Sequence, residues 1–215
     1  MAKRIFVTAT NTNIGKTYTT KLLLREFASR GLLVGAIKPI ETGVRDGYAE
    51  DAEELLDTIK ELNPKLWSLD VSDVVVMTYE LAAAVFVASN NEKLDIKKIV
   101  SKIEEMENLC DILIIEGAGG LYVPIDDEYM MIDLIKLLDA KALLVTHCSL
   151  GCINDTLLSV KALKESGISF AVAFNCRSDQ EESFSIVSEP YFLQSGFNVL
   201  KVGGDIEKIC DVLYN

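Results

Sequence analysis

The stretch that decides the fold is Val7-Thr8-Ala9-Thr10-Asn11-Thr12-Asn13-Ile14-Gly15-Lys16-Thr17, which joins a short apolar run to a helical pattern. Small residues let consecutive backbone N–H groups turn toward phosphate oxygens, and the N-terminus of the following helix adds partial positive charge. Lys16 would reach the β- and γ-phosphates, and the Thr17 hydroxyl would bind Mg²⁺. Thr10 stands where the pattern G-x-x-x-x-G-K-[ST] has its first glycine. The stretch predicts a nucleoside triphosphate loop; the alternative is a chance Gly-Lys-Thr at a helix start.

Outward from this loop, short apolar runs alternate with helical patterns along the chain. Such alternation predicts parallel strands, right-handed crossovers and helices on both faces of the sheet. The expected strands are residues 4–8, 33–37, 111–116, 142–146, 169–175 and 198–202, and the expected helices are residues 16–30, 50–62, 81–89, 96–109, 130–138, 154–166, 181–194 and 205–213. Residues 71–79 have an extended but ambiguous pattern. The predicted fold class is α/β, a parallel β-sheet flanked by helices on both faces, in a single domain over residues 1–215.

Composition narrows the classes of partner. The formal net charge of −12 repels nucleic acid and anionic lipid, so neither is expected as a partner. No apolar run reaches the roughly 18 residues of a spanning helix, and the N-terminus enters an apolar strand at once, so we expect a cytoplasmic protein. None of the five cysteines forms Cys-x-x-Cys, and His147 is the only histidine. We therefore expect reduced, mostly buried thiols, with no zinc site and no disulfide framework.

Two further motifs each follow an apolar run, and ligands of parallel sheets bind at the carboxyl ends of strands. Lys38 opens Lys38-Pro39-Ile40-Glu41-Thr42-Gly43 and is a candidate second cation for the phosphates. Taken alone, Lys38 is better interpreted as a solvated loop lysine. Glu116 precedes Gly117-Ala118-Gly119-Gly120 and is a candidate Mg²⁺ ligand, with glycines that let the backbone approach a ligand. The alternative is a glycine-rich turn with an incidental Glu.

Other candidates are weaker on the residues alone. Ser149-Leu150-Gly151-Cys152-Ile153-Asn154 suits an anion at a helix start, and an ordinary capped connection explains it equally well. His147 is better interpreted as structural, because catalysis also needs a geometric partner. Asn175 ends a strand and could offer a donor and an acceptor to a purine, or be a turn residue. Asp51 lies in an acidic stretch typical of a solvated helix face.

Together these motifs resemble the dethiobiotin synthetase family of P-loop NTPases. The family patterns V-T-G-T-D-T-x-V-G-K-T, K-P-[VI]-x-[ST]-G, E-G-A-G-G and L-G-C-I-N are matched in order by residues 7–17, 38–43, 116–120 and 150–154. The chain departs from the family at Ala9, Asn11 and Ser149, where relatives have Gly, Asp and often Lys. It also lacks a Pro-containing base-recognition loop around residues 202–205.

The resemblance implies an enzyme, an ATP-dependent ligase of biotin biosynthesis. In that family, 7,8-diaminononanoate takes up CO2 as a carbamate, and the carbamate attacks the γ-phosphate of ATP. The second amine then closes the ring, which gives dethiobiotin, ADP and phosphate. ATP, preferred over GTP, and Mg²⁺ are the implied cofactors. A homodimer is implied because the loop at residues 150–154 acts in the site of the other subunit.

The resemblance also implies residue roles. The catalytic residues would be Thr12, Lys16, Lys38 and Thr42. Those that bind the nucleotide would be Asn13, Ile14, Gly15, Lys16, Thr17, Tyr18, Glu116, Gly117, Gly119 and Asn175. Those that bind the substrate would be Thr12, Lys38, Thr42, Gly119, Gly151, Cys152, Ile153 and Asn154. The Mg²⁺ ligands would be Thr17, Asp51 and Glu116.

The leading alternative is a partition or cell-division ATPase of the ParA or MinD type, which is a switch. Those proteins have a lysine four residues before the loop glycine, where this chain has Asn11, and often a basic C-terminal helix, whereas residues 205–215 are acidic overall. A cobyrinate-type amidating synthetase would need a glutaminase domain for which 215 residues leave no room. A non-catalytic nucleotide-binding module is a third alternative, which product formation would separate from an enzyme.

Overall fold

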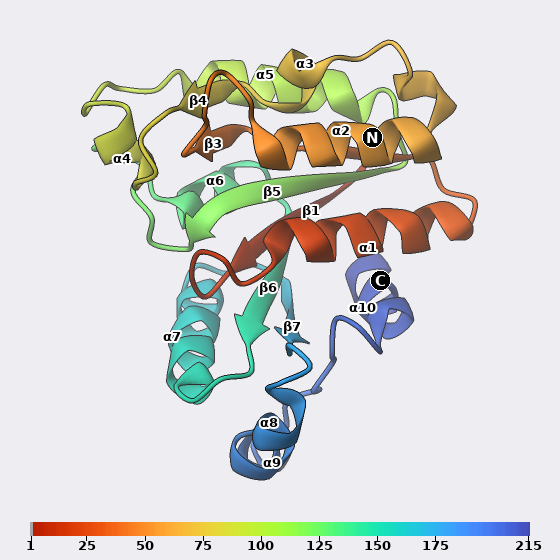
Figure 1. Ribbon diagram of the computed structural model, residues 1–215, viewed down its shortest axis with the longest axis vertical. Helices are drawn as coiled ribbons and strands as arrows, with labels where there is room; N and C mark the ends of the chain where they lie inside the picture. The colour runs from red at the N-terminus through yellow and green to blue at the C-terminus, as the bar shows by residue number, and fades with distance from the viewer. Residues whose placement is uncertain (1) are drawn as a thin grey trace.

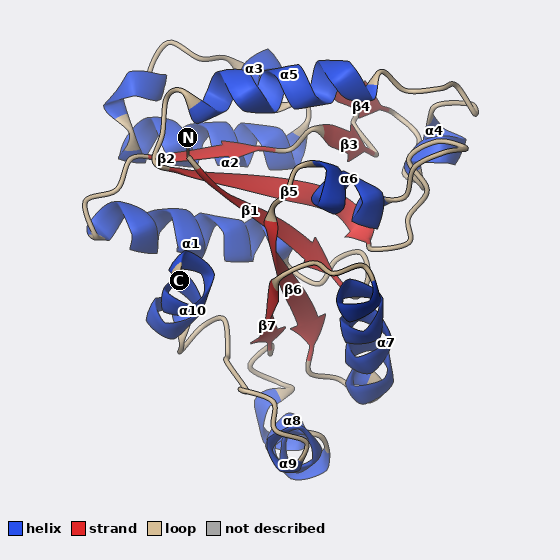
Figure 2. Cartoon of the chain, turned by 180° about the vertical axis from the view of Figure 1, so that it is seen from behind, coloured by secondary structure: helices blue, strands red, loops and turns tan. Residues whose placement is uncertain are grey.

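The structure, a computed structural model, describes residues 2–215 and is built on a five-stranded parallel sheet with strand order β2-β5-β1-β6-β7 (Figures 1 and 2). A separate two-stranded parallel sheet pairs β3 with β4. The strands are β1 (Lys3–Ala9), β2 (Val34–Ile37), β3 (Ile40–Thr42), β4 (Met77–Tyr79), β5 (Ile112–Gly120), β6 (Lys141–His147) and β7 (Phe170–Asn175). The predicted α/β class is confirmed.

Helices cover both faces of the large sheet. Helices α1 and α10 lie on one face, and α5, α6 and α7 lie on the other, as the two opposite views show (Figures 1 and 2). Helix α2 packs against α1 and β2. The helices are α1 (Lys16–Ser29), α2 (Glu50–Leu62), the 3₁₀ turn η1 (Pro64–Leu66), α3 (Val71–Val74), α4 (Val85–Ala88), α5 (Ile96–Glu107), α6 (Met131–Leu137), α7 (Cys152–Glu165), α8 (Glu181–Val187), α9 (Glu189–Gln194) and α10 (Ile206–Tyr214). None of the helices within residues 2–215 combines the length and apolar character needed to cross a bilayer.

The inner strands β1 and β5 lie within the hydrophobic core. In β1 and β5, side chains on both faces are fully buried, from Ile5 to Val7 and from Leu113 to Ile115. Strands covered by helices on both faces have continuous apolar runs, which is why the sequence pattern located them. The carboxyl ends of β1, β2 and β5 lie side by side because the strands are parallel neighbours. The phosphate-loop candidate follows β1 and Lys38 follows β2, whereas Glu116 lies within β5, which continues past the expected end at residue 116 to Gly120.

Some predicted elements differ from the structure. The strand expected at residues 198–202 is reduced to an isolated bridge between Lys201 and Phe174, because the chain turns away at once after that contact. The helix expected at residues 181–194 is divided into α8 and α9 at Ser188, where Pro190 lacks the N–H that a continuous helix requires.

The region of residues 71–89 also differs from expectation. The ambiguous pattern at residues 71–79 splits into α3 and β4, and only α4 is helical within residues 81–89. Strand β3 was not predicted, because three residues carry too little pattern to recognise. Its partner β4 places Met77, Thr78 and Tyr79 opposite Ile40, Glu41 and Thr42.

A disulfide joins Cys148 to Cys176, so the expectation of reduced thiols is wrong for this pair. The parallel register of β6 and β7 places His147 opposite Asn175, so the next residue on each strand is a cysteine and the two Cα atoms lie 5.0 Å apart. Sequence spacing gave no sign of this pairing, because the cysteines are 28 residues apart. Cys110, Cys152 and Cys210 are buried free thiols. Burial raises the pKa of Cys110 and of Cys210 to about 12, which keeps both protonated.

We expect reduction of the Cys148–Cys176 bond to lower the free energy of unfolding by about 3–4 kcal/mol, because the bond restricts the unfolded chain over a separation of 28 residues. Denaturant titrations with and without a reductant measure the change. The Cys176→Ser variant should be destabilised to a similar extent and should not respond to the reductant. Five free thiols in the unfolded, unreduced protein would contradict the bond, whereas three are expected.

Candidate functional site

The loop between β1 and α1 presents unpaired donors at the start of a helix. Within residues 2–215, the backbone N–H groups of residues 13–17 donate to no other group of the protein. Gly15 has φ +94°, and a Cβ there would lie 2.2 Å from Nδ2 of Asn175, so this position requires glycine. Asn175 Nδ2 also donates to the carbonyl oxygen of Ile14 at 2.7 Å, which holds the loop against the end of β7. The arrangement is that of an anion site at a helix N-terminus.

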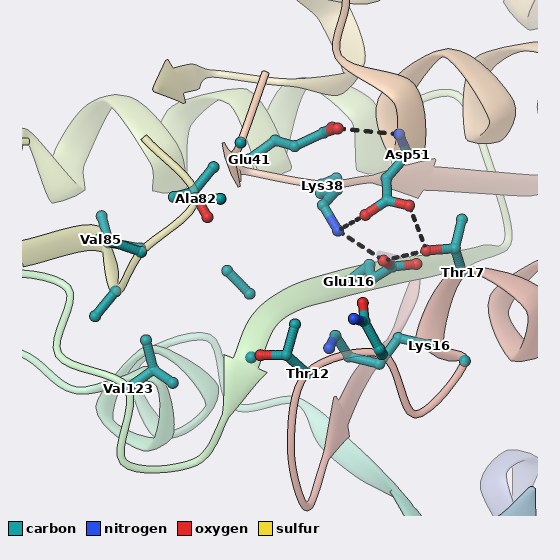
Figure 3. A pocket seen from close by; sticks show the side chains of 18 residues that line it. Thr12, Lys16, Thr17, Lys38, Glu41, Asp51, Ala82, Val85, Glu116 and Val123 are labelled. Atoms are coloured by element: carbon teal, nitrogen blue, oxygen red, sulfur yellow. Dashed lines mark hydrogen bonds and ion pairs between the residues drawn. The ribbon is translucent and has the colours of Figure 1, made fainter. Parts of the chain in front are cut away.

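The loop forms one side of a cleft of about 700 Å³ (Figure 3). The opposite side combines polar groups that follow β2 with Asp51 from the start of α2. Glu116 and Gly119 of β5 contribute the floor. Ala82, Val85 and Val123 form an apolar wall at the end of the cleft away from Asp51 (Figure 3), and the neighbouring Ala83 and Ala84 also line the cleft.

A compact polar cluster of Thr17, Lys38, Asp51 and Glu116 occupies the end of the cleft beside α1 (Figure 3). Thr17 Oγ1 lies 2.8 Å from Asp51 Oδ1 and 2.8 Å from Glu116 Oε1. Lys38 Nζ donates to Asp51 Oδ2 at 2.5 Å and to Glu116 Oε1 at 2.8 Å. Thr20 Oγ1 donates to the second oxygen of Glu116 at 2.9 Å. The interpretation of Lys38 and Asp51 as solvated surface residues is therefore wrong, since both belong to this cluster.

Burial and pairing set the charges of this cluster. Burial lowers the pKa of Lys38, but the carboxylates of Glu116 and Asp51 outweigh burial and raise it above its ordinary value. Burial raises the pKa of Asp51, but the ammonium of Lys38 outweighs it and leaves the pKa below its ordinary value. Lys38 is therefore a fixed cation and Asp51 a fixed anion near neutral pH.

Lys16 differs from Lys38 although both line the cleft. Its side chain is buried, and no carboxylate within residues 2–215 forms an ion pair with it. Burial, followed by the charge of Lys38, lowers the pKa of Lys16. A buried ammonium with no partner is stabilised by an anion, so Lys16 is the cation in this cleft that a ligand would neutralise.

Glu41 was missed by the sequence analysis, which treated its position in the Lys38 motif as variable. Its buried carboxylate accepts the N–H groups of Asp51 and Ala52, each at 3.0 Å. Burial raises the pKa of Glu41, while these two hydrogen bonds and Lys38 oppose the change. The apolar wall was also missed, because its alanines had been assigned to a helix at residues 81–89. No pattern in the sequence marked Glu41, because β3 is only the three residues Ile40, Glu41 and Thr42.

Most of the predicted site residues meet in the cleft: Thr12, Asn13, Gly15, Lys16, Thr17, Lys38, Thr42, Asp51, Glu116 and Gly119. Tyr18 is exposed and does not line it. Gly117 faces the core instead, where an added Cβ would lie 2.7 Å from Cε1 of Phe6. Ile14 and Asn175 line a second cavity of about 520 Å³ on the other side of the loop.

The predicted substrate residues Gly151, Cys152, Ile153 and Asn154 do not line the cleft of their own subunit. They begin α7, where Cys152 is buried and the neighbouring Leu150 is 89% exposed. His147 lies just before this helix, between Ser149 Oγ at 2.5 Å and Asp155 Oδ2 at 3.0 Å. These contacts are consistent with a structural role for His147.

Comparison with known proteins identifies a matching family and close relatives of this chain. Residues 3–212 match the protein family described as an AAA domain. The ATP-dependent dethiobiotin synthetase BioD of Sulfurovum sp. is 48% identical over 188 residues, which cover 87% of this chain and 89% of that protein. The protein of the same name from Wolinella succinogenes is 34% identical over 213 residues, 98% of each chain.

Among solved structures, a ParA family ATPase from Chlorobium tepidum TLS covers 99% of this chain and 92% of its own, with a TM-score of 0.54 and 16% identity. Likeness at that identity shows the fold alone, so it gives no functional support to the alternative of a partition ATPase. The sequence relatives, in contrast, match at 34–48% identity over nearly all of both chains. The chain therefore belongs to the family of ATP-dependent dethiobiotin synthetases.

Proposed function

We propose that this protein catalyses the ATP-dependent carboxylation and ring closure of 7,8-diaminononanoate with CO2 to dethiobiotin, ADP and phosphate. The observation that carries the proposal is the cleft itself. It combines unpaired N–H donors and Lys16 with the cluster of Lys38, Asp51 and Glu116, and it ends in an apolar wall. A phosphoryl transfer needs the N–H donors, Lys16 and the polar cluster. An aliphatic substrate needs the apolar wall. Family membership supplies the identity of the substrate.

The reaction has three stages: carbamate formation, phosphoryl transfer and ring closure. One amine of the substrate adds to CO2 and loses a proton, which gives a carbamate. A carbamate oxygen attacks the γ-phosphorus, and the bond to the β-phosphate oxygen breaks, releasing ADP. The second amine attacks the carbonyl carbon and loses a proton while phosphate leaves, which closes the cyclic urea.

The protein's part in the phosphoryl step is to position and neutralise charge rather than to supply a nucleophile. The N–H groups of residues 13–17 and the ammonium of Lys16 would bind the β- and γ-phosphate oxygens. Lys38 would stabilise charge on the carbamate and the transferred phosphoryl group. Thr12 and Thr42, which both line the cleft, would orient the carbamate and the phosphate.

Mg²⁺ fits the group of Thr17, Asp51 and Glu116. The hydroxyl of Thr17 has one hydrogen, yet its oxygen lies 2.8 Å from a carboxylate oxygen of each partner, so one of these close approaches lacks a hydrogen. Within residues 2–215, no three His, Cys, Asp or Glu side chains form a complete metal site. Mg²⁺ is commonly held by one or two carboxylates together with substrate phosphates. Bound here, it would neutralise charge on the β- and γ-phosphates.

Asn175 supports ATP as the nucleotide. Its Nδ2 donates one hydrogen to the carbonyl oxygen of Ile14, the amide oxygen remains an acceptor, and Asn175 lines the second cavity. The exocyclic amine of adenine donates a hydrogen bond, whereas guanine carries a carbonyl oxygen at the same ring position. The amide oxygen of Asn175 can therefore accept a hydrogen bond from the exocyclic amine of adenine.

The active site would be completed by a second subunit in a homodimer. Residues 151–154 begin a helix whose N-terminus suits the substrate carboxylate, yet they lie outside the cleft of their own chain. Leu150 just before this helix and Leu158 within it are exposed. A second copy would bury these side chains and bring the helix N-terminus to the partner's cleft.

We expect Lys16→Ala to lower the rate of dethiobiotin formation by about 100-fold or more, because it removes the unpaired cation that would bind the phosphates. Its melting temperature should stay unchanged or rise, since a buried ammonium without a partner is lost. Product formation and thermal melts measure both effects. Lys21→Ala is the matched control, because Lys21 lies on the same helix and pairs with Glu54 at the surface. Near wild-type turnover in Lys16→Ala would exclude the assigned role.

We expect Asp51→Asn to raise the Mg²⁺ concentration that gives half-maximal activity about tenfold or more, because one of two carboxylate ligands is lost. Direct binding of Mn²⁺, followed by electron paramagnetic resonance, should weaken in parallel. Asp57→Asn on the same helix is the control, since Asp57 lies outside the cleft. Unaltered Mn²⁺ binding in Asp51→Asn would remove Asp51 from the metal site.

We expect activity to return when two inactive variants, Lys16→Ala and Asn154→Ala, are mixed. In a mixed dimer, one composite site would contain both substitutions and the other neither. After full subunit exchange of equal amounts, about one quarter of wild-type activity should appear. Differently tagged subunits verify the exchange. If exchange is complete and no activity returns, each site is built within one subunit.

A further inference from the structure

The start of α2 lacks a local cap. The first four N–H groups of any helix have no partner within the helix, and a side chain at the N-cap position normally satisfies one of them. Here the N-cap residue is Ala49, which has no side-chain group that can accept a hydrogen bond. The first turn of α2 nevertheless carries Asp51, whose carboxylate contacts Thr17 and Lys38.

The missing cap comes from another element. Glu41 of β3 directs one carboxylate oxygen to the N–H of Asp51 and the other to the N–H of Ala52, each at 3.0 Å. Figure 3 shows the first of these hydrogen bonds. Glu41 as a whole is 6% exposed, so little water competes for these bonds. A negative charge at this position also interacts favourably with the helix dipole. Both oxygens of Glu41 are thereby committed to the backbone of α2.

We propose that Glu41 is the positioning residue for Asp51: it fixes the first turn of α2 so that the Asp51 carboxylate reaches the proposed metal site. The inference rests on the proposed function, since it assigns a role toward Mg²⁺. Glu41 acts through Asp51 and does not touch the reacting atoms. Because Thr42 is the next residue of β3, the same anchor ties the strand that carries Thr42 to the helix that carries Asp51.

The geometric part can be tested in the unaltered protein without metal or nucleotide. Amide hydrogen exchange, read residue by residue by nuclear magnetic resonance, should show the N–H groups of Asp51 and Ala52 strongly protected. The N–H of Glu50, in the same turn but without such a partner, should exchange much faster. Equal, fast exchange at all three positions would overturn the proposal.

The functional part uses Glu41→Gln. The amide keeps one accepting oxygen but turns an N–H₂ group toward a backbone N–H, so one of the two bonds is lost. We expect Mn²⁺ binding to weaken about tenfold, as happens when support around a metal ligand is removed. At saturating Mg²⁺, kcat should stay within about threefold of wild type, because no group that touches substrate is changed.

Glu50→Gln is the matched control, since it removes the same charge from the same helix end without touching the cap. It should leave Mn²⁺ binding within about twofold, consistent with the small effect of exposed charges near a helix terminus. If Glu41→Gln does not fold, Glu41→Asp keeps the charge with shorter reach and should show an intermediate loss of Mn²⁺ affinity.

The outcomes separate this inference from the proposed function. Weak Mn²⁺ binding in Asp51→Asn together with normal binding in Glu41→Gln would overturn the positioning role and leave the proposed function standing. A large fall in kcat of Glu41→Gln at saturating Mg²⁺, with Mn²⁺ affinity unchanged, would instead assign Glu41 to the chemistry and overturn the inference. Normal Mn²⁺ binding in both variants would count against the metal site itself.

Discussion

The burial of the Glu116 carboxylate is the constraint on which the rest of the site depends. Its side chain has no exposed surface in the middle of β5, where an uncompensated charge would cost several kcal/mol. Lys38, Thr17 and Thr20 compensate it, and they come from the chain after β2 and from the first turns of α1. Satisfying one buried charge therefore sets the relative positions of three segments, and the cleft is the space that remains between them.

The two lysines of the cleft, Lys38 and Lys16, have different electrostatic roles. The carboxylates hold the pKa of Lys38 above its ordinary value, so Lys38 belongs to the charge balance of the protein and is unsuited to accept a proton. Burial lowers the pKa of Lys16, whose charge is left for a ligand to balance. An arriving triphosphate would thus relieve an unfavourable state of the free protein. Part of the binding free energy for phosphate would then come from neutralising the buried charge of Lys16, which destabilises the unliganded fold.

Whether a feature could be predicted from the sequence depends on how far apart along the chain its interacting residues lie. The loop of residues 7–17 and the strands around Ile5 and Ile114 carry local patterns, so they were recognised. The pairing of β3 with β4, the cap from Glu41 to α2 and the bond from Cys148 to Cys176 join segments separated in the sequence, and no local pattern encodes them. The proposed role of Asp51 as a metal ligand came only from family resemblance, because an acidic residue among other acidic residues is typical of a solvated helix face. Gly117 shows that a motif residue can also be constrained by packing, since an added Cβ there would lie 2.7 Å from Cε1 of Phe6.

The contact of Gly117 with Phe6 has a consequence for how sequences of this fold can diverge. The ring of Phe6 fills the volume that a side chain at position 117 would need, and Met131 borders the same space. A smaller residue at position 6 would open room for alanine at position 117, while either change alone would leave a void or a clash in the core. The two positions are therefore expected to vary as a pair among relatives. If position 117 is always glycine among relatives, packing accounts for it: a side chain there would clash with the aromatic ring on the neighbouring strand, whether or not a nucleotide binds.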